Sequence, residues 1–292
     1  MSETASLRRT LTAAASVEVT PRDAARIADF AEQLGADTSV FITALPGADL
    51  DDLVPAAASV RAAGLSPVPH LPARALEGPE QLDRLLGRLV EEAQVDDVLA
   101  IAGSVKKQVG SYSSSLEVLH SGLLERHGIR RVGVAGHPEG SPDIVPEAAR
   151  EALQAKNAFA AKSELDLRIV TQFALASAPY IAYEREIREQ GNRLPLIAGL
   201  PGVTSPPTLV KFGIACGIGP SLEVLRKQAG GLVKLATTRL WKPDGIVDEI
   251  AAAAEHDPDS LFAGLHFFPF GGLERTAAWL AAARSEVAAR QA

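Results

Sequence analysis

The stretch SVEVTPRDAARIADFAEQLG, residues 16–35, has the pattern of one β-strand followed by one α-helix. SVEVT supplies a short strand with valines at every second position. Thr20 followed by Pro21 is typical of a helix N-cap with proline at the first helical position, and Gly35 is typical of a helix end. The stretch therefore predicts a single strand and helix unit, and the rest of the chain repeats that unit.

Seven further β-like runs follow, and several are almost wholly apolar, which is typical of parallel strands covered on both faces. They are SVFITA (39–44), SPVPHL (66–71), DVLAIAG (97–103), RVGVAG (131–136), LRIVTQF (167–173), LPLIAG (194–199) and GLHFFPF (264–270). Helical patterns lie between them, as in residues 80–93 and 115–128, and the alanine-rich tail 276–292 predicts a last helix. Eight alternations over 292 residues predict an α/β fold, a (β/α)8 TIM-type barrel.

We expect one barrel domain over residues 1–292, with residues 1–13 as a candidate flexible segment. Residues 202–255 hold more helical pattern than one unit requires, which predicts an extra helix pair before the eighth strand. A doubly wound open sheet is the main alternative. It is disfavoured because no GxGxxG follows the first strand and no glycine-rich linker divides the chain.

Composition limits the kinds of molecule that we expect the protein to bind. The chain is 47% hydrophobic and carries a net charge of −7, which argues against a nucleic-acid or anionic-membrane surface and favours a small molecule. A homo-oligomer is left open. Cys216 is the single cysteine, so no intrachain disulfide forms, and we interpret it as a buried structural thiol. No run approaches the ~20 apolar residues of a membrane helix, and we expect a cytoplasmic protein.

Active sites of such barrels lie at the carboxyl ends of the strands, and Glu18 is the first candidate there. Its carboxylate stands between two valines, and a charge inside a strand costs several kcal/mol unless it is paired or protonated. One interpretation is a proton donor near neutral pH. The other is a salt bridge that closes the barrel, with Arg74 or Lys156 as the partner. Position alone does not separate the two.

Other polar residues also lie at the carboxyl ends of predicted strands. Gln172 has an amide that can read a heterocycle or serve as a satisfied core group, and His70 can meet a ligand or be structurally bonded. The remaining strand-end candidates are Thr43, Ser104, His137, Glu139 and His266.

No metal site is predicted. His120 and His127 fall seven residues apart on one helical face, without a carboxylate or third histidine, which favours a solvated face. The run AIAGSVKKQVG, residues 100–110, lacks a nucleotide-triphosphate motif around Lys106 and Lys107, so we expect an exposed loop over the barrel mouth.

Five motifs taken together resemble the methylenetetrahydrofolate reductase family over nearly the whole chain. In chain order they are SVEVTPRD, PVPHLPAR, AGHPEGSPDI, IVTQF and LHFFPFGG. The resemblance implies a (β/α)8 barrel with FAD at the carboxyl ends of the strands. It also implies hydride transfer from NADH or NADPH, through the flavin, to 5,10-methylenetetrahydrofolate, which gives 5-methyltetrahydrofolate.

The resemblance assigns roles to particular positions. Glu18 matches the family's proton donor, and Gln172 matches its folate-contacting glutamine, with Phe173 beside the ligand rings. The positions that match flavin or cofactor contacts are Thr43, His70, Gly103, Ser104, His137 and Lys156.

Departures from the family pattern cluster on the flavin contacts. Ser104 stands where the family has an aspartate, His137 stands where it has a tyrosine, and Ala174, Leu175 and Ala176 replace an aromatic residue and an aspartate. Two variants follow. In one, FAD is retained and Lys106 or Lys107 pairs its pyrophosphate; in the other, no flavin is used and hydride passes directly from the nicotinamide to the folate carbon.

Two hypotheses from other classes stay open. One is a folate-binding protein without redox activity that acts as a partner in one-carbon methyl transfer. The other is a barrel lyase that uses Lys156, or another lysine, as a Schiff base.

Overall fold

The strands of the computed structural model, which describes residues 3–105, 107–218 and 240–289, form a closed barrel in the order β1 to β8. The predicted TIM barrel is confirmed. The strands are β1 (Ser16–Val19), β2 (Ser39–Ile42), β3 (Ser66–Pro72), β4 (Asp97–Ile101), β5 (Arg131–Gly136), β6 (Asp166–Thr171), β7 (Leu196–Pro201) and β8 (Phe262–Phe268). Each lies within about two residues of the run that predicts it.

Helices follow the strands in alternation. The described α-helices are α1 (Glu3–Ala13), α2 (Pro21–Ala24), α3 (Ala31–Leu34), α4 (Leu53–Ala62), α5 (Pro79–Ala93), α6 (Ser115–Leu119), α7 (Leu123–Arg126), α8 (Pro146–Ala160), α9 (Ser177–Glu189), α10 (Pro206–Ala215), α13 (Asp244–Glu255) and α14 (Leu273–Ala289). Short 3₁₀ helices are η1 (Ile27–Phe30), η2 (Leu50–Asp52) and η3 (Ala73–Ala75).

The first strand and helix segment, residues 16–35, begins and ends as predicted, but its helix is broken. Thr20 Oγ1 accepts the Asp23 N–H at 3.2 Å, and Gly35 ends the segment with φ 81°. Between them the chain forms α2, η1 and α3 in place of one helix. Ala24, Ile27 and Leu34, one from each piece, are all buried.

The predicted helix over residues 115–128 is likewise wrong as a single helix. The chain breaks at Gly122, with φ 69°, into α6 and α7, so His120 and His127 do not share one helical face. His127 Nε2 lies 2.6 Å from a carboxylate oxygen of Asp83, an ion-pair contact in place of the expected solvated face.

The chain divides into two compact units, where the sequence predicts one domain. We call residues 16–135 with 152–169 the N-terminal unit, and residues 1–15, 136–151 and 170–292 the C-terminal unit.

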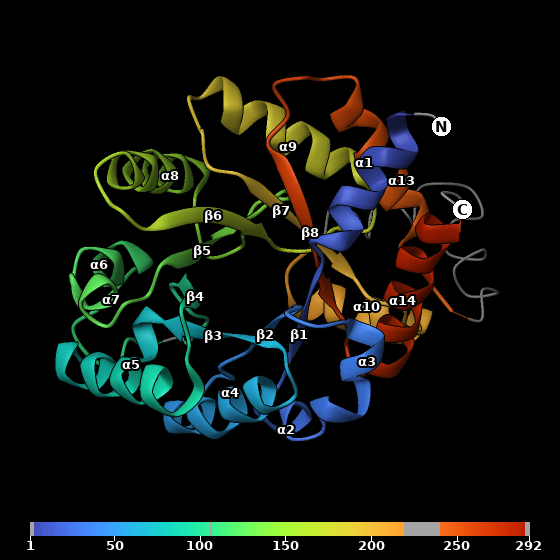
Figure 1. Ribbon diagram of the computed structural model, residues 1–292. Coiled ribbons are helices and arrows are strands. Elements are labelled where there is room, and N and C mark those ends of the chain that lie inside the picture. Colours follow the sequence, from blue (N-terminus) through green and yellow to red (C-terminus); the bar gives the residue numbers. More distant parts are fainter. Residues whose placement is uncertain (1–2, 106, 219–239, 290–292) are drawn as a thin grey trace. The chain divides into compact units, whose positions relative to one another are not determined.

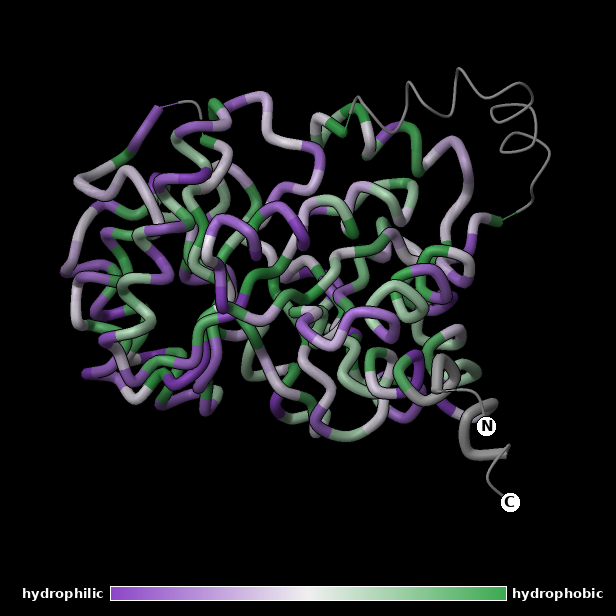
Figure 2. Tube along the Cα trace, turned by 90° about the horizontal axis from the view of Figure 1, so that it is seen from above, coloured by the Kyte–Doolittle hydropathy of each residue, from purple (hydrophilic) through white to green (hydrophobic). Residues whose placement is uncertain are grey.

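Helices α4 and α5 lie side by side in the N-terminal unit, along strands β2 to β4 (Figure 1). Leu82, Leu85, Leu86 and Leu89 of α5 are all buried, at spacings that place them on one helix face. Hydrophilic and hydrophobic segments alternate along the helical parts of the chain (Figure 2), as expected for helices with one covered face.

The C-terminal unit pairs β7 with β8 in register from Ile197 opposite Gly264 to Pro201 opposite Phe268. Helix α1 packs on β8, α13 and α14 (Figure 1). Leu11 and Thr12 are both 1% exposed, so the segment expected to be flexible is instead a docked helix from Glu3 onward.

Helices α10 and α13 both lie in residues 202–255, which agrees with the excess of helical pattern there. The remainder of the predicted extra pair falls in residues 219–239, outside the described residues. Over the described ranges, no helix has the length and apolar character needed to cross a membrane.

Gly199 of β7 generates a stability prediction. A Cβ at this position would lie 2.0 Å from the carbonyl oxygen of Thr171 and 2.8 Å from Phe268 Cε2. Because a backbone atom cannot yield as a flexible side chain does, we expect Gly199→Ala to lower the free energy of unfolding by about 1–3 kcal/mol in urea titrations.

The matched control is Gly245→Ala in α13, where a Cβ meets nothing within 4 Å. Alanine there should leave stability unchanged or raise it by up to about 1 kcal/mol. Equal midpoints for the two variants would contradict the close packing of Gly199.

Candidate functional site

One face of the N-terminal unit collects the polar residues of its strands. Glu18 of β1 lies opposite Phe41 of β2, and Phe41 lies opposite Val68 of β3. Because register partners in parallel strands point to the same side, these three residues share a face, and His70, two residues after Val68, joins them. Glu18 and His70 are therefore brought to one surface by the strand register.

Glu18 and His70 make a carboxylate and imidazole contact. Glu18 Oε2 lies 3.5 Å from His70 Nε2, and their side chains are 22% and 6% exposed. This separation is long for a strong hydrogen bond but short enough for charge attraction in a partly buried site. The rings of His70 and Phe41 are T-shaped to each other, with an interplanar angle of 77° and centroids 6.2 Å apart. His70 is a partner of Glu18 that neither sequence interpretation named.

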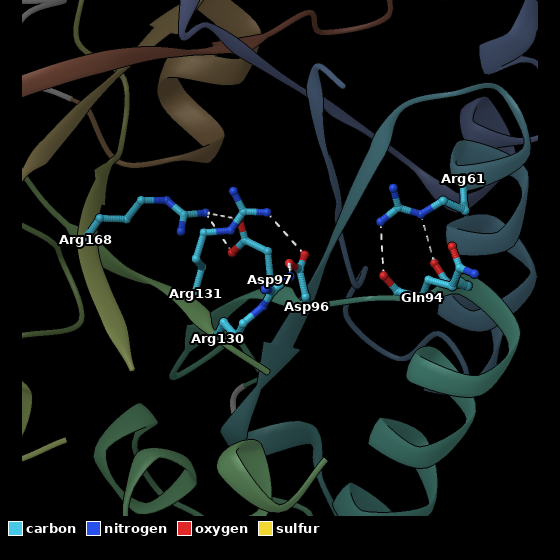
Figure 3. A network of polar contacts seen from close by, with 8 residues as sticks. Arg61, Gln94, Asp96, Asp97, Arg130, Arg131 and Arg168 are labelled. Atoms are coloured by element: carbon cyan, nitrogen blue, oxygen red, sulfur yellow. Dashed lines mark hydrogen bonds and ion pairs between the residues drawn. The ribbon is translucent and has the colours of Figure 1, made fainter. Parts of the chain in front are cut away.

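A buried ion pair also lies near Phe41. Arg168 Nη2 is 2.8 Å from both carboxylate oxygens of Asp97, and its guanidinium carbon lies 5.8 Å from the centroid of the Phe41 ring. Arg131 Nε adds a longer contact of 3.6 Å to Asp97. Figure 3 shows the three charged side chains converging from β4, β5 and β6.

Burial raises the pKa of the Asp96 and Asp97 carboxyl groups, whereas the neighbouring arginines lower it. Asp97 is 3% exposed, and desolvation raises its pKa in spite of the attraction of Arg168. For Asp96, burial also favours the neutral acid, but hydrogen bonds from Arg130 and Arg131 outweigh it and the pKa is lowered. The sequence signal for this network was present, since Asp97 and Arg168 interrupt apolar strands as Glu18 does.

The other predicted cofactor contacts of the N-terminal unit follow two different strands: Thr43 follows β2, and Gly103 and Ser104 follow β4. Thr43 follows β2, is half-buried, and its backbone N–H donates to the Val19 carbonyl at 2.9 Å. Gly103 has φ 86°, and a Cβ there would lie 2.9 Å from Pro72 Cβ, so the backbone approaches β3 closely. Ser104 is exposed, as is Lys107, which agrees with the expected open loop; Lys106 lies outside the described residues.

Lys156 lies within α8 rather than after it. The side chain is partly exposed, yet the protein around it disfavours the charged form, and this desolvation lowers the pKa of Lys156 to about 8. Desolvation therefore favours the neutral amine, which is the nucleophilic form of a lysine side chain.

In the C-terminal unit, Gln172 and Phe173 come immediately after β6. The Gln172 backbone N–H donates to the Gly136 carbonyl at 2.8 Å, and its Oε1 accepts the Phe173 N–H at 3.0 Å. This internal bond engages the amide oxygen, so the NH2 group is the part of the amide suited to a ligand acceptor.

Phe173 is 1% exposed and belongs to an aromatic cluster of this unit. Its ring centroid lies 4.9 Å from that of Phe270 and 5.8 Å from that of Phe268, both of which are half-buried. Phe173 therefore supports these two rings. Cys216 packs against the same cluster and is half-buried, less covered than the sequence suggested.

Two tyrosines of α9 hold the loops on either side of Gln172. The Tyr180 hydroxyl bonds to the backbone of Ala174 and to the Gly199 carbonyl, and burial raises the pKa of Tyr180 well above its usual range. Burial also raises the pKa of Tyr183 to about 12, while a hydrogen bond with the backbone of half-buried His137 opposes that shift. Tyr183 thus fixes the backbone of one predicted contact.

Metal-binding groups do not gather in the parts of the chain that the structure describes. No set of three or more His, Cys, Asp or Glu side chains there could hold a metal ion.

Comparison with solved structures shows a likeness at low sequence identity. No protein-family model matches this chain. Among solved structures, it is similar to Yersinia pestis dihydropteroate synthase with a bound pterin–sulfa conjugate, with a TM-score of 0.45, 15% sequence identity and 93% of each chain covered.

The Asp97–Arg168 pair generates a second stability prediction. Asp97→Asn leaves Arg168 without its carboxylate partner, and loss of one member of a buried pair costs about 3–5 kcal/mol. In Asp97→Asn with Arg168→Met, neither charge is stranded, so urea unfolding should show a smaller loss than the sum of the single variants.

Arg26→Met is the control, because Arg26 pairs with Asp29 at a site where the side chains are 76% and 57% exposed. Its unfolding midpoint should stay close to that of the parent. Additive losses for the Asp97 and Arg168 variants would contradict their coupling.

Lys156 generates a pH-dependent prediction. Below pH 8 both folded and unfolded states hold the proton and the full burial penalty opposes folding, whereas the penalty disappears as pH rises from about 8 to 10.5. Lys156→Met removes the penalty, so its gain in melting temperature over the parent should be largest at pH 7 and shrink toward pH 10. Exposed Lys162→Met should show no such trend.

Proposed function

We propose that this protein reduces 5,10-methylenetetrahydrofolate to 5-methyltetrahydrofolate with NADH or NADPH as the hydride source. The observation that carries the proposal is the Glu18 carboxyl in contact with His70 on one face of the strands, where the reaction needs a proton donor. The ordered motifs shared with the methylenetetrahydrofolate reductase family supply the substrate class.

The chemistry requires one proton and one hydride. Glu18 gives its proton to N10 of the folate, the bond between N10 and the bridging carbon breaks, and that carbon remains on N5 as an iminium. The nicotinamide supplies hydride to this carbon, which becomes the methyl group. The resemblance also implies a folate contact for Gln172, whose NH2 group can donate to a ligand acceptor.

FAD does not fit the residues at its expected contacts. Ser104 is exposed and carries no charge where the resemblance places an aspartate, and His70 faces Glu18 rather than an open flavin position. Within the described part of the 100–110 loop, exposed Lys107 is the cation that remains for a pyrophosphate. We therefore favour the flavin-free variant, in which hydride passes directly from the nicotinamide to the folate carbon.

A second candidate function rests on Lys156, whose pKa of about 8 suits an amine that forms a Schiff base with a carbonyl substrate. Borohydride trapping with a panel of aldehydes and ketones, followed by mass spectrometry of the α8 peptide, tests it. A borohydride adduct on Lys156 would support the lyase, and its absence across the panel would count against it.

Replacement of the proton donor tests the reductase. We expect Glu18→Gln to fold as the parent does and to lose about 100-fold or more in the rate of nicotinamide oxidation with methylenetetrahydrofolate, because a general acid has been removed. Exposed Glu32→Gln is the matched control and should retain parent activity.

The same assay, run with and without added FAD, separates the variants. Activity without flavin absorbance and without stimulation by FAD supports direct transfer, whereas dependence on FAD would overturn it. Tight folate binding without turnover in the parent would replace the reductase by the folate-binding partner protein.

A further inference from the structure

We propose that His70 is the residue that returns a proton to Glu18 after each turnover, a role that rests on the proposed reductase function. The observation is the 3.5 Å contact between His70 Nε2 and Glu18 Oε2, with the imidazole 6% exposed and the carboxylate 22% exposed. The family resemblance implies a flavin contact for His70; the geometry points to an exchange of protons with Glu18.

The reaction creates a need for such a residue. Once Glu18 has protonated N10 it is a carboxylate beside bound ligand, and it must regain a proton before it can act again. The His70 imidazolium gives its Nε2 proton to the Glu18 oxygen and becomes neutral, then takes a proton from water. One proton thus passes from solvent to N10 for each hydride delivered, which balances the reduction.

Histidine suits this step because its charge changes near neutral pH, and a neighbouring carboxylate favours the imidazolium. At 3.5 Å the contact is long for a hydrogen bond but allows charge attraction between the two side chains.

The side chains around His70 restrict the position of its imidazole and determine the electrostatic field on it. Phe41, 2% exposed, forms a T-shaped ring pair with His70, and the Arg168 guanidinium lies over the Phe41 ring. Four charged side chains in the described part of the N-terminal unit take part in the contacts around His70 and Phe41 or in the adjoining ion pairs. They are Glu18, Asp97, Arg131 and Arg168. The Asp97 carboxylate neutralises Arg168 at 2.8 Å, so the attraction between Glu18 and His70 is not dominated by an isolated cation.

Transient and steady-state kinetics of His70→Gln test the relay. In a single turnover started with Glu18 protonated, hydride transfer should stay within about threefold of the parent, because the first proton is already in place. Steady-state kcat should fall about 10-fold or more, since reprotonation becomes limiting, with little change in KM. His120→Gln, an exposed histidine of the same unit, is the control and should match the parent.

Chemical rescue and the pH profile distinguish a relay from mere packing. His70→Ala opens the space of an imidazole ring, and added imidazole should restore much of its steady-state rate. The pH dependence of kcat should change in His70→Gln and stay as in the parent in His120→Gln. Equal losses in single-turnover and steady-state rates, with no rescue by imidazole, would overturn the relay and leave a structural role.

A measurement without turnover separates this inference from the proposed function. In an NMR titration of histidine ring signals, the His70 midpoint should move to lower pH in Glu18→Gln, because the carboxylate that favours imidazolium is gone. An unmoved midpoint refutes the exchange even if the protein is a reductase, and it also decides the case if His70→Gln fails to fold. A moved midpoint with no reductase activity in the parent refutes the proposed function instead.

Discussion

The buried ion pair between Asp97 and Arg168 is the interaction on which the polar face of the N-terminal unit depends. A charge inside a strand is expensive unless another strand supplies its partner, so this pair ties β4 to β6 at 2.8 Å. The same guanidinium covers Phe41, and Phe41 in turn packs against His70. The position of His70 beside Glu18 is therefore linked, through Phe41, to this charge pair.

These contacts are the basis of the role that we propose for His70. The imidazole contacts an aromatic ring and a carboxylate, which suits the proposed proton exchange with Glu18. Ser104, exposed and uncharged, stands where the resemblance implies an aspartate near a flavin. In the flavin-free reaction that we propose, Glu18 is the acid and His70 is the source of its proton.

Strand content could be predicted from the sequence because apolar runs of four to seven residues carry their own signal. Helix continuity could not. Residues 21–35 and 115–128 both have apolar residues at helical spacing. The first segment breaks near Ile27, whose side chain is buried, and the second breaks at Gly122, whose backbone is left-handed. Helix α1 was missed as a docked element for a related reason, since the burial of Leu11 depends on contacts with α13, α14 and β8.

The sequence by itself determined the barrel, the strand that carries Glu18, and the position of Gln172 after β6, since period, apolar content and strand ends are local properties. Only the tertiary structure decided which side chains meet. Glu18 and His70 are 3.5 Å apart although 52 residues separate them, and Asp97 finds Arg168 71 residues away. Strand register and the energetic need to pair buried charges select those partners, and neither is encoded in any short stretch of residues.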